Sequence, residues 1–100
     1  MTNILLCCSA GMSTSLLVTK MQHAATERNI DSKIWAVSVD EVEQHINAAD
    51  VLLLGPQIKF LRGEIEPLAN GIPLGVIPMR DYGTLNGGKV LEFALSLLDK

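Results

Sequence analysis

The chain has 100 residues, 48% of them hydrophobic and 19% charged, and a formal net charge of −3, which together exclude a disordered tail and argue against nucleic acid as a partner. Its length suits one domain over residues 1–100 with a single main site. No apolar run approaches the roughly 20 residues of a membrane helix and the start lacks a basic signal region, so we expect a cytoplasmic protein without direct membrane insertion.

The first predicted element is a buried strand over residues 3–8, a continuous apolar run that ends in small residues. From Ser13 the hydrophobic period becomes helical, and Asn29 favours the end of that helix. Alternation along the strand places Cys7 and Cys8 on opposite sides of a sheet, and two adjacent cysteines form a disulfide only with strain. We therefore expect a buried, inert thiol at Cys7 and a working thiol at Cys8.

Three further strands alternate with helices along the rest of the chain. The predicted strands cover residues 33–39, 51–54 and 74–77, and the predicted helices cover residues 40–47, 58–68 and 90–98. Asp40 and Glu43 have the spacing of a capping box at the start of the second helix. Pro67 should break or kink the third helix, and residues 78–88 are predicted to form a loop.

This alternation predicts a single α/β domain, with a four-stranded parallel sheet and helices on both faces. In a sheet of order 2-1-3-4, the first and third strands flank the crevice in which ligands bind. The loops that begin at Cys8 and Gly55 follow those two strands. Topology therefore predicts a site at Cys8, with a phosphate-binding loop after the first strand.

The residues after Cys8 have the composition of an anion-binding loop. Small side chains let backbone N–H groups converge, and the start of a helix adds partial positive charge. The same environment favours thiolate over thiol, which makes Cys8 a nucleophile. The loop therefore suits a covalent phosphocysteine, and its hydroxyl groups can face the phosphoryl oxygens.

A small cysteine phosphatase of the low-molecular-weight type is the first alternative. Phosphatases with this kind of loop place an arginine six residues after the cysteine and use an acid from an Asp-Pro pair. In this chain Thr14 occupies the arginine position, and no Asp-Pro pair occurs. Phosphate transfer is therefore favoured over hydrolysis.

Residues 8–17, CSAGMSTSLL, resemble the phosphorylation loop of the IIB family specific for lactose, cellobiose or N,N'-diacetylchitobiose in the phosphoenolpyruvate-dependent sugar phosphotransferase system (PTS). Residues 53–58, LLGPQI, resemble a second signature of that family. The resemblance implies a phosphotransferase whose Cys8 accepts phosphate from the phosphohistidine of a IIA protein. The acceptor would be a sugar, such as cellobiose, chitobiose or lactose, bound by the membrane protein IIC, which the carrier meets transiently at the membrane.

The resemblance also implies the residues of the site. The backbone that would bind the phosphate belongs to Ser9, Ala10, Gly11, Met12, Ser13, Thr14 and Ser15. The turn Gly55-Pro56-Gln57 would border the site, and Tyr82 falls where the family often has a tyrosine. No metal or organic cofactor is needed, because amides and a helix N-terminus supply the positive electrostatics. A phosphorylation-sensing regulatory module is the second alternative, because a sensor would carry the same loop.

Overall fold

The four apolar runs predicted as strands form one parallel sheet in the computed structural model, which describes residues 1–8 and 11–99 and only the backbone of residues 11–13. The strand order is β2-β1-β3-β4, which confirms the predicted order. The strands are β1 (Thr2–Cys8), β2 (Ser32–Ser38), β3 (Val51–Leu54) and β4 (Leu74–Val76). The two strands with continuous apolar sequences, β1 and β3, therefore occupy the centre of the sheet.

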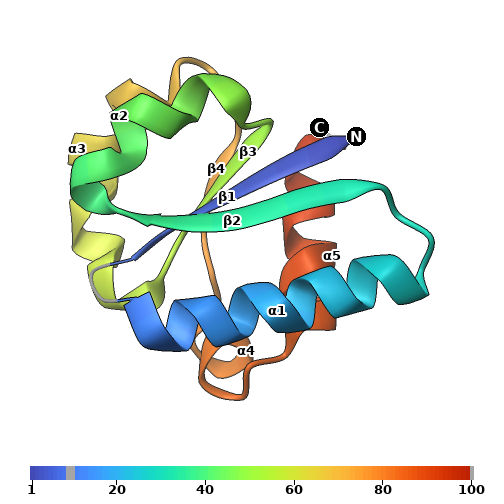
Figure 1. The fold of residues 1–100 in the computed structure, drawn as a ribbon. Helices are drawn as coiled ribbons and strands as arrows, with labels where there is room; N and C mark the ends of the chain where they lie inside the picture. The colour runs from blue at the N-terminus through green and yellow to red at the C-terminus, as the bar shows by residue number, and fades with distance from the viewer. Residues whose placement is uncertain (9–10, 100) are drawn as a thin grey trace.

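Helices cover both faces of this sheet. Figure 1 shows α1, α4 and α5 on one side, and α2 and α3 with their flanking 3₁₀ turns on the other. Their bounds are α1 (Gly11–Glu27), α2 (Val42–His45), α3 (Arg62–Ile65), α4 (Met79–Gly83) and α5 (Gly87–Leu98). In the part of the chain that the structure describes, none of these helices is long and apolar enough to cross a membrane.

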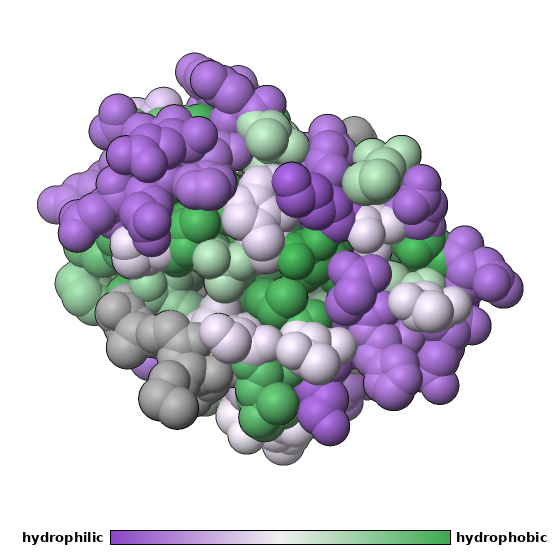
Figure 2. Space-filling view, viewed as in Figure 1, coloured by the Kyte–Doolittle hydropathy of each residue, from purple (hydrophilic) through white to green (hydrophobic). Residues whose placement is uncertain are grey.

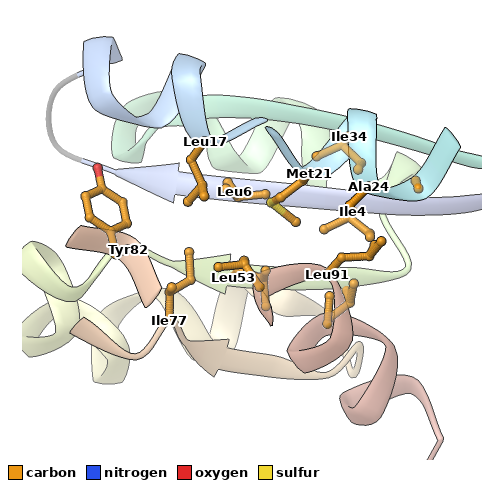
Figure 3. Packing of buried hydrophobic residues seen from close by; sticks show 14 of the residues in the cluster. Ile4, Leu6, Leu17, Met21, Ala24, Ile34, Leu53, Ile77, Tyr82 and Leu91 are labelled. Carbon is orange, nitrogen blue, oxygen red and sulfur yellow. The ribbon is translucent and has the colours of Figure 1, made fainter. Parts of the chain in front are cut away.

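Strand alternation divides the core into two clusters. Ile4, Leu6 and Cys8 face α1 and α5, whereas Leu5 and Cys7 face α2 and α3. Figure 3 shows the first cluster, in which side chains from α1 and α5 meet those of β1 and β3. Cys7 and Cys8 thus lie on opposite faces of the sheet, as the two-residue period predicts.

The ends of the helices follow local backbone chemistry. Asn29 adopts a left-handed conformation (φ 57°) just beyond α1, and Ile30 N–H donates to the Ala25 carbonyl at 2.8 Å, which confirms the predicted stop. The segment around Pro67 is broken into α3 and two 3₁₀ turns, Pro56–Leu61 and Glu66–Ala69, which confirms the predicted break.

Three local predictions were wrong. The predicted loop over residues 78–88 contains α4 and the start of α5, because a helix of one turn is too short to show a 3.6-residue period. Helix α1 begins at Gly11 and not at Ser13. Glu41, not Glu43, caps the turn after β2: its Oε1 accepts hydrogen bonds from Ser38 N–H (3.3 Å) and Ser38 Oγ (3.0 Å), because β2 ends one residue earlier than predicted.

The contact between α1 and α5 depends on a glycine. A Cβ atom at Gly87 would lie 2.3 Å from the carbonyl carbon of Lys20, so only glycine allows this close approach. Asn86 caps α5, since its side-chain oxygen accepts a hydrogen bond from Lys89 N–H at 3.1 Å. Asn86 N–H in turn donates to the carbonyl of Asp81 at 2.9 Å, which fixes α4 and brings its side chains to the carboxyl end of the sheet.

Candidate functional site

Cys8 is the last residue of β1, and α1 begins three residues later at Gly11. Thr14, in the first turns of α1, is 1% exposed, and its Oγ1 forms a hydrogen bond with Cys8 Sγ. The sulfur therefore lies beside the N-terminal end of a 17-residue helix, where partial positive charge favours an anion.

Tyr82 reaches the same sulfur from α4. Its hydroxyl oxygen lies 3.1 Å from Thr14 Oγ1 and 3.8 Å from Cys8 Sγ. Figure 3 shows Tyr82 at the edge of the first core cluster, with its hydroxyl group pointing toward the end of β1. Burial raises the pKa of the Tyr82 phenol above its usual value, although the hydrogen bond with Thr14 acts in the opposite direction. Tyr82 therefore keeps its proton at neutral pH and can donate a hydrogen bond.

The turn after β3 packs directly against Cys8. Gly55 N–H donates to the carbonyl of Cys7 at 2.9 Å. A Cβ atom at Gly55 would lie 3.3 Å from Cys8 Sγ and 3.0 Å from Gln57 Oε1, so a larger residue would press on both groups. Pro56 is buried, and the exposed Gln57 interacts through its side chain with Tyr82. Of these predicted border residues, Gly55 and Tyr82 therefore lie against Cys8, and Gln57 reaches the site through Tyr82.

A pocket of about 230 Å³ opens on the other side of Cys8, between the ends of β1 and β2. We call it the Cys8 pocket. It differs in place from the predicted crevice between the first and third strands, because the Gly55 turn lies against the sulfur on that side. The residues that line it are Cys8, Thr14, Ser15, Ala36, Val37, Ser38 and Glu41.

The wall of the Cys8 pocket that belongs to β2 was not predicted from the sequence. Ser38 lies beside Cys8 in the parallel register of β1 and β2, and Glu41 follows in the capped turn. The predicted strand order 2-1-3-4 could have indicated this wall, because it places the end of the second strand next to Cys8. Among the residues that line the pocket, Glu41 is the charged one, and no lysine or arginine occurs.

The predicted phosphate-binding residues are described to different extents. Ser9 and Ala10 lie outside the described residues. Gly11, Met12 and Ser13 form the first turn of α1, and their side chains also lie outside the description. Thr14 and Ser15 line the Cys8 pocket. Within the described side chains, no group of three or more His, Cys, Asp or Glu residues could hold a metal ion.

A second hollow, of about 520 Å³, lies between α1 and β2. Figure 2 shows hydrophobic side chains across the middle of this face, where Figure 1 places α1 and β2, and hydrophilic side chains over α2. The hollow is lined by Val18, Thr19, Gln22, His23, Thr26 and Ile34. These residues include neither a cysteine nor a carboxylate.

Comparison with known proteins identifies similar sequences. Residues 3–93 match the family model described as PTS system, Lactose/Cellobiose specific IIB subunit. The galactose-specific EIIB component of the PTS from Lactococcus lactis subsp. cremoris (strain MG1363) is 47% identical, over 96% of this chain and 95% of that protein. The oligo-beta-mannoside-specific EIIB component from Bacillus subtilis (strain 168) is 46% identical, over 98% of this chain and 97% of that protein.

Solved structures with the same fold carry related names. The solution structure of the cellobiose-specific phosphotransferase IIB component from Borrelia burgdorferi is 40% identical, with a TM-score of 0.81 over 98% of this chain and 92% of that chain. The lactose-specific IIB component domain from Streptococcus pneumoniae has a TM-score of 0.84 over 95% of each chain. Its identity of 18% means that this second likeness concerns the fold alone.

Proposed function

Because the chain belongs to the lactose/cellobiose-specific IIB family of the sugar phosphotransferase system, we propose that it carries phosphate on Cys8 from a IIA phosphohistidine to a sugar bound by IIC. IIB components are sugar phosphotransferases that work with IIA and IIC partners. The observation that carries the proposal is the position of Cys8 Sγ, which lies beside the N-terminal end of α1 and opens onto a pocket large enough for a tetrahedral anion.

The proposed reaction consists of two in-line displacements at phosphorus. In the first, the Cys8 thiolate forms a bond to phosphorus while the P–N bond of the donor breaks, and the electron pair stays on the imidazole nitrogen. In the second, a sugar hydroxyl oxygen attacks phosphorus, the S–P bond breaks, and the electron pair returns to Cys8 Sγ. The proton of the sugar hydroxyl leaves to a base on the acceptor side or to solvent.

Backbone N–H groups of residues 9–15 would stabilise the phosphoryl oxygens in both steps, together with the N-terminal end of α1. The described lining of the Cys8 pocket supplies hydroxyl groups from Thr14, Ser15 and Ser38 but no cationic side chain. A neutral loop of this kind holds the phosphoryl group less tightly than an arginine clamp would. That difference favours passing the phosphate on over retaining it.

We propose that the phosphate acceptor is a sugar and that β-linked disaccharides are the favoured substrates. Two of the similar proteins are named as cellobiose-specific and oligo-beta-mannoside-specific components, and a third is named as galactose-specific. The proposed location is the cytoplasm, with transient contact at the membrane through IIC.

The test follows labelled phosphate from phosphoenolpyruvate through the upstream proteins to this chain. Wild type and Cys7→Ala should carry label, and Cys8→Ser should not, because only Cys8 lines the pocket. Equal labelling of all three proteins would refute the proposal. Steady hydrolysis of p-nitrophenyl phosphate by the isolated protein would favour the phosphatase in its place.

A further inference from the structure

Three polar atoms meet beside the Cys8 pocket: Cys8 Sγ and Thr14 Oγ1, whose residues line it, and the hydroxyl oxygen of Tyr82 behind them. Thr14 Oγ1 contacts the sulfur and lies 3.1 Å from the Tyr82 oxygen, whereas the Tyr82 oxygen lies 3.8 Å from the sulfur. All three residues are buried, and Cys8 and Tyr82 belong to the hydrophobic cluster between the sheet and α1. Water therefore competes little for these hydrogen bonds.

The number of available protons decides the direction of the bonds. A thiolate accepts only, and each hydroxyl group has one proton to donate, so among these three groups two protons must serve three contacts. If both hydroxyls donated to sulfur, their oxygens would face each other at 3.1 Å without a proton between them. If Tyr82 donates to Thr14 and Thr14 donates to sulfur, both short contacts are filled and only the 3.8 Å contact is left empty.

We propose that Tyr82 is a positioning residue that acts on Cys8 through Thr14: it donates its proton to Thr14 Oγ1 and thereby commits the Thr14 proton to the Cys8 sulfur. The bond from Thr14 to a thiolate is charge-assisted, and the bond from Tyr82 polarises the Thr14 hydroxyl and strengthens it. Tyr82 thus favours the thiolate although its own oxygen is distant from the sulfur.

The same arrangement serves the phosphorylated state, and this part of the inference rests on the proposed function. When Sγ bonds to phosphorus, the negative charge moves from sulfur to the phosphoryl oxygens. Rotation of the Thr14 hydroxyl would let its proton follow the charge, while Tyr82 continues to hold Thr14 Oγ1. The pair would therefore stabilise the anion on both sides of the transfer, as preorganised donors do.

The test measures the rate of Cys8 alkylation by iodoacetamide against pH, in a Cys7→Ala background that leaves one thiol. Tyr82→Phe keeps the ring and should raise the midpoint of the pH profile by about one unit, which corresponds to a tenfold change in the ionisation equilibrium. Thr14→Val should raise the midpoint further. The charged and titratable groups that face the sulfur are Glu41 and Tyr82, and Glu41 is the same in both variants.

The double variant Thr14→Val/Tyr82→Phe separates an indirect effect from a direct one. If Tyr82 acts through Thr14, the double variant should have the midpoint of Thr14→Val alone. Additive shifts would mean that Tyr82 acts directly on sulfur and would overturn the proposal, as would a Tyr82→Phe midpoint equal to that of the parent. Thr14→Ser retains the hydroxyl group, so its midpoint should lie close to that of the parent and well below that of Thr14→Val.

Matched controls exclude a general effect on folding. Thr19→Val removes a hydroxyl from α1 that donates to the Ser15 carbonyl, and Thr84→Val removes one beside α4 that donates to the Arg80 carbonyl. Both should keep the parent midpoint, and thermal melts should show that every variant is folded. Because alkylation needs no PTS partner, the result decides the role of Tyr82 even if the wild type accepts no phosphate, an outcome that would refute only the proposed function.

Discussion

Cys7 and Cys8 are neighbours in one strand, yet their surroundings have little in common. Cys7 is fully buried in the apolar cluster under α2 and α3, with Leu5 and Leu54. Cys8 lies on the other face, where it contacts the Thr14 and Tyr82 hydroxyls and lines a pocket. The Cys8 side chain is itself only 5% exposed, so low exposure alone does not distinguish the two thiols.

What separates the two thiols is the chemistry of the groups that touch them. Burial, with a smaller contribution from Cys8, raises the pKa of the Cys7 thiol from 9.0 to about 12. Cys8 instead has the Thr14 hydroxyl group and the end of a helix beside its sulfur. A step of one residue along a strand, which turns a side chain to the opposite face, is enough to produce this difference.

The largest expected difference is in reactivity. At pH 8 iodoacetamide should alkylate Cys8 in Cys7→Ala at least about a hundredfold faster than it alkylates Cys7 in Cys8→Ser, because a buried thiol with a high pKa reacts only after local opening. Mass spectrometry of the intact protein over time measures both rates. Similar rates would show that Cys7 is accessible and would remove the contrast between the two thiols.

The free energy of unfolding should depend more on Cys7 than on Cys8, the reverse of their order in reactivity. Cys7→Ser places a hydroxyl group in an apolar cluster and should lower the free energy of unfolding by about 1–3 kcal/mol. Cys8→Ser should lower it by less than about 1 kcal/mol, since the new hydroxyl can bond with Thr14 and Tyr82. Urea denaturation checks this, and a greater loss for Cys8→Ser would contradict the assignment of Cys7 to the dry core.

Alkaline pH should expose the role of Cys7 in stability. Below its ordinary pKa of 9.0 both the folded and the unfolded chain keep the proton, so Cys7 causes no pH dependence there. Above pH 9.0 the unfolded chain loses a proton that the folded chain retains until about pH 12, so the free energy of unfolding falls as pH rises. One such group contributes a slope of at most about 1.4 kcal/mol per pH unit.

Denaturation of Cys7→Ala should therefore depend less steeply on pH above 9.0 than that of wild type. Some slope should persist in the variant, since burial also raises the pKa of Tyr82. Parallel curves for the two proteins would mean that Cys7 does not hold its proton in the folded state.

Much of this contrast is readable in the sequence. Continuous apolar runs identify the buried strands, the change to a helical period locates α1, and alternation alone assigns Cys7 and Cys8 to opposite faces. Small residues after Cys8 indicate an anion site because they act through backbone geometry, which depends on local sequence. These signals are local, so they can be recognised in the sequence without knowledge of the fold.

The parts that the sequence did not predict depend on register and on short elements. Glu41 lines the Cys8 pocket because β2 ends at Ser38, beside Cys8. The predicted strand ended one residue later, at residue 39, and for that reason Glu41 was not predicted to lie at the pocket. The helix that carries Tyr82 has five residues, too few for a periodic signal. The bond between Tyr82 and Thr14 joins residues 68 positions apart, and its direction depends on counting protons in three dimensions.

Glu41 gives the smallest expected effect and the finest test of the surroundings of Cys8. Its carboxylate is held by Ser38 at the wall of the Cys8 pocket, so Glu41→Gln should remove a negative charge while the side-chain oxygen still accepts those bonds. Because a nearby negative charge disfavours a thiolate, alkylation of Cys8 near neutral pH should become about two- to threefold faster at low salt. The gain should shrink at about 1 M salt, where the screening length falls to about 3 Å. Glu43→Gln, exposed on α2 and absent from the pocket lining, is the control and should leave the rate unchanged, so an equal gain there would assign the effect to net charge and not to the pocket.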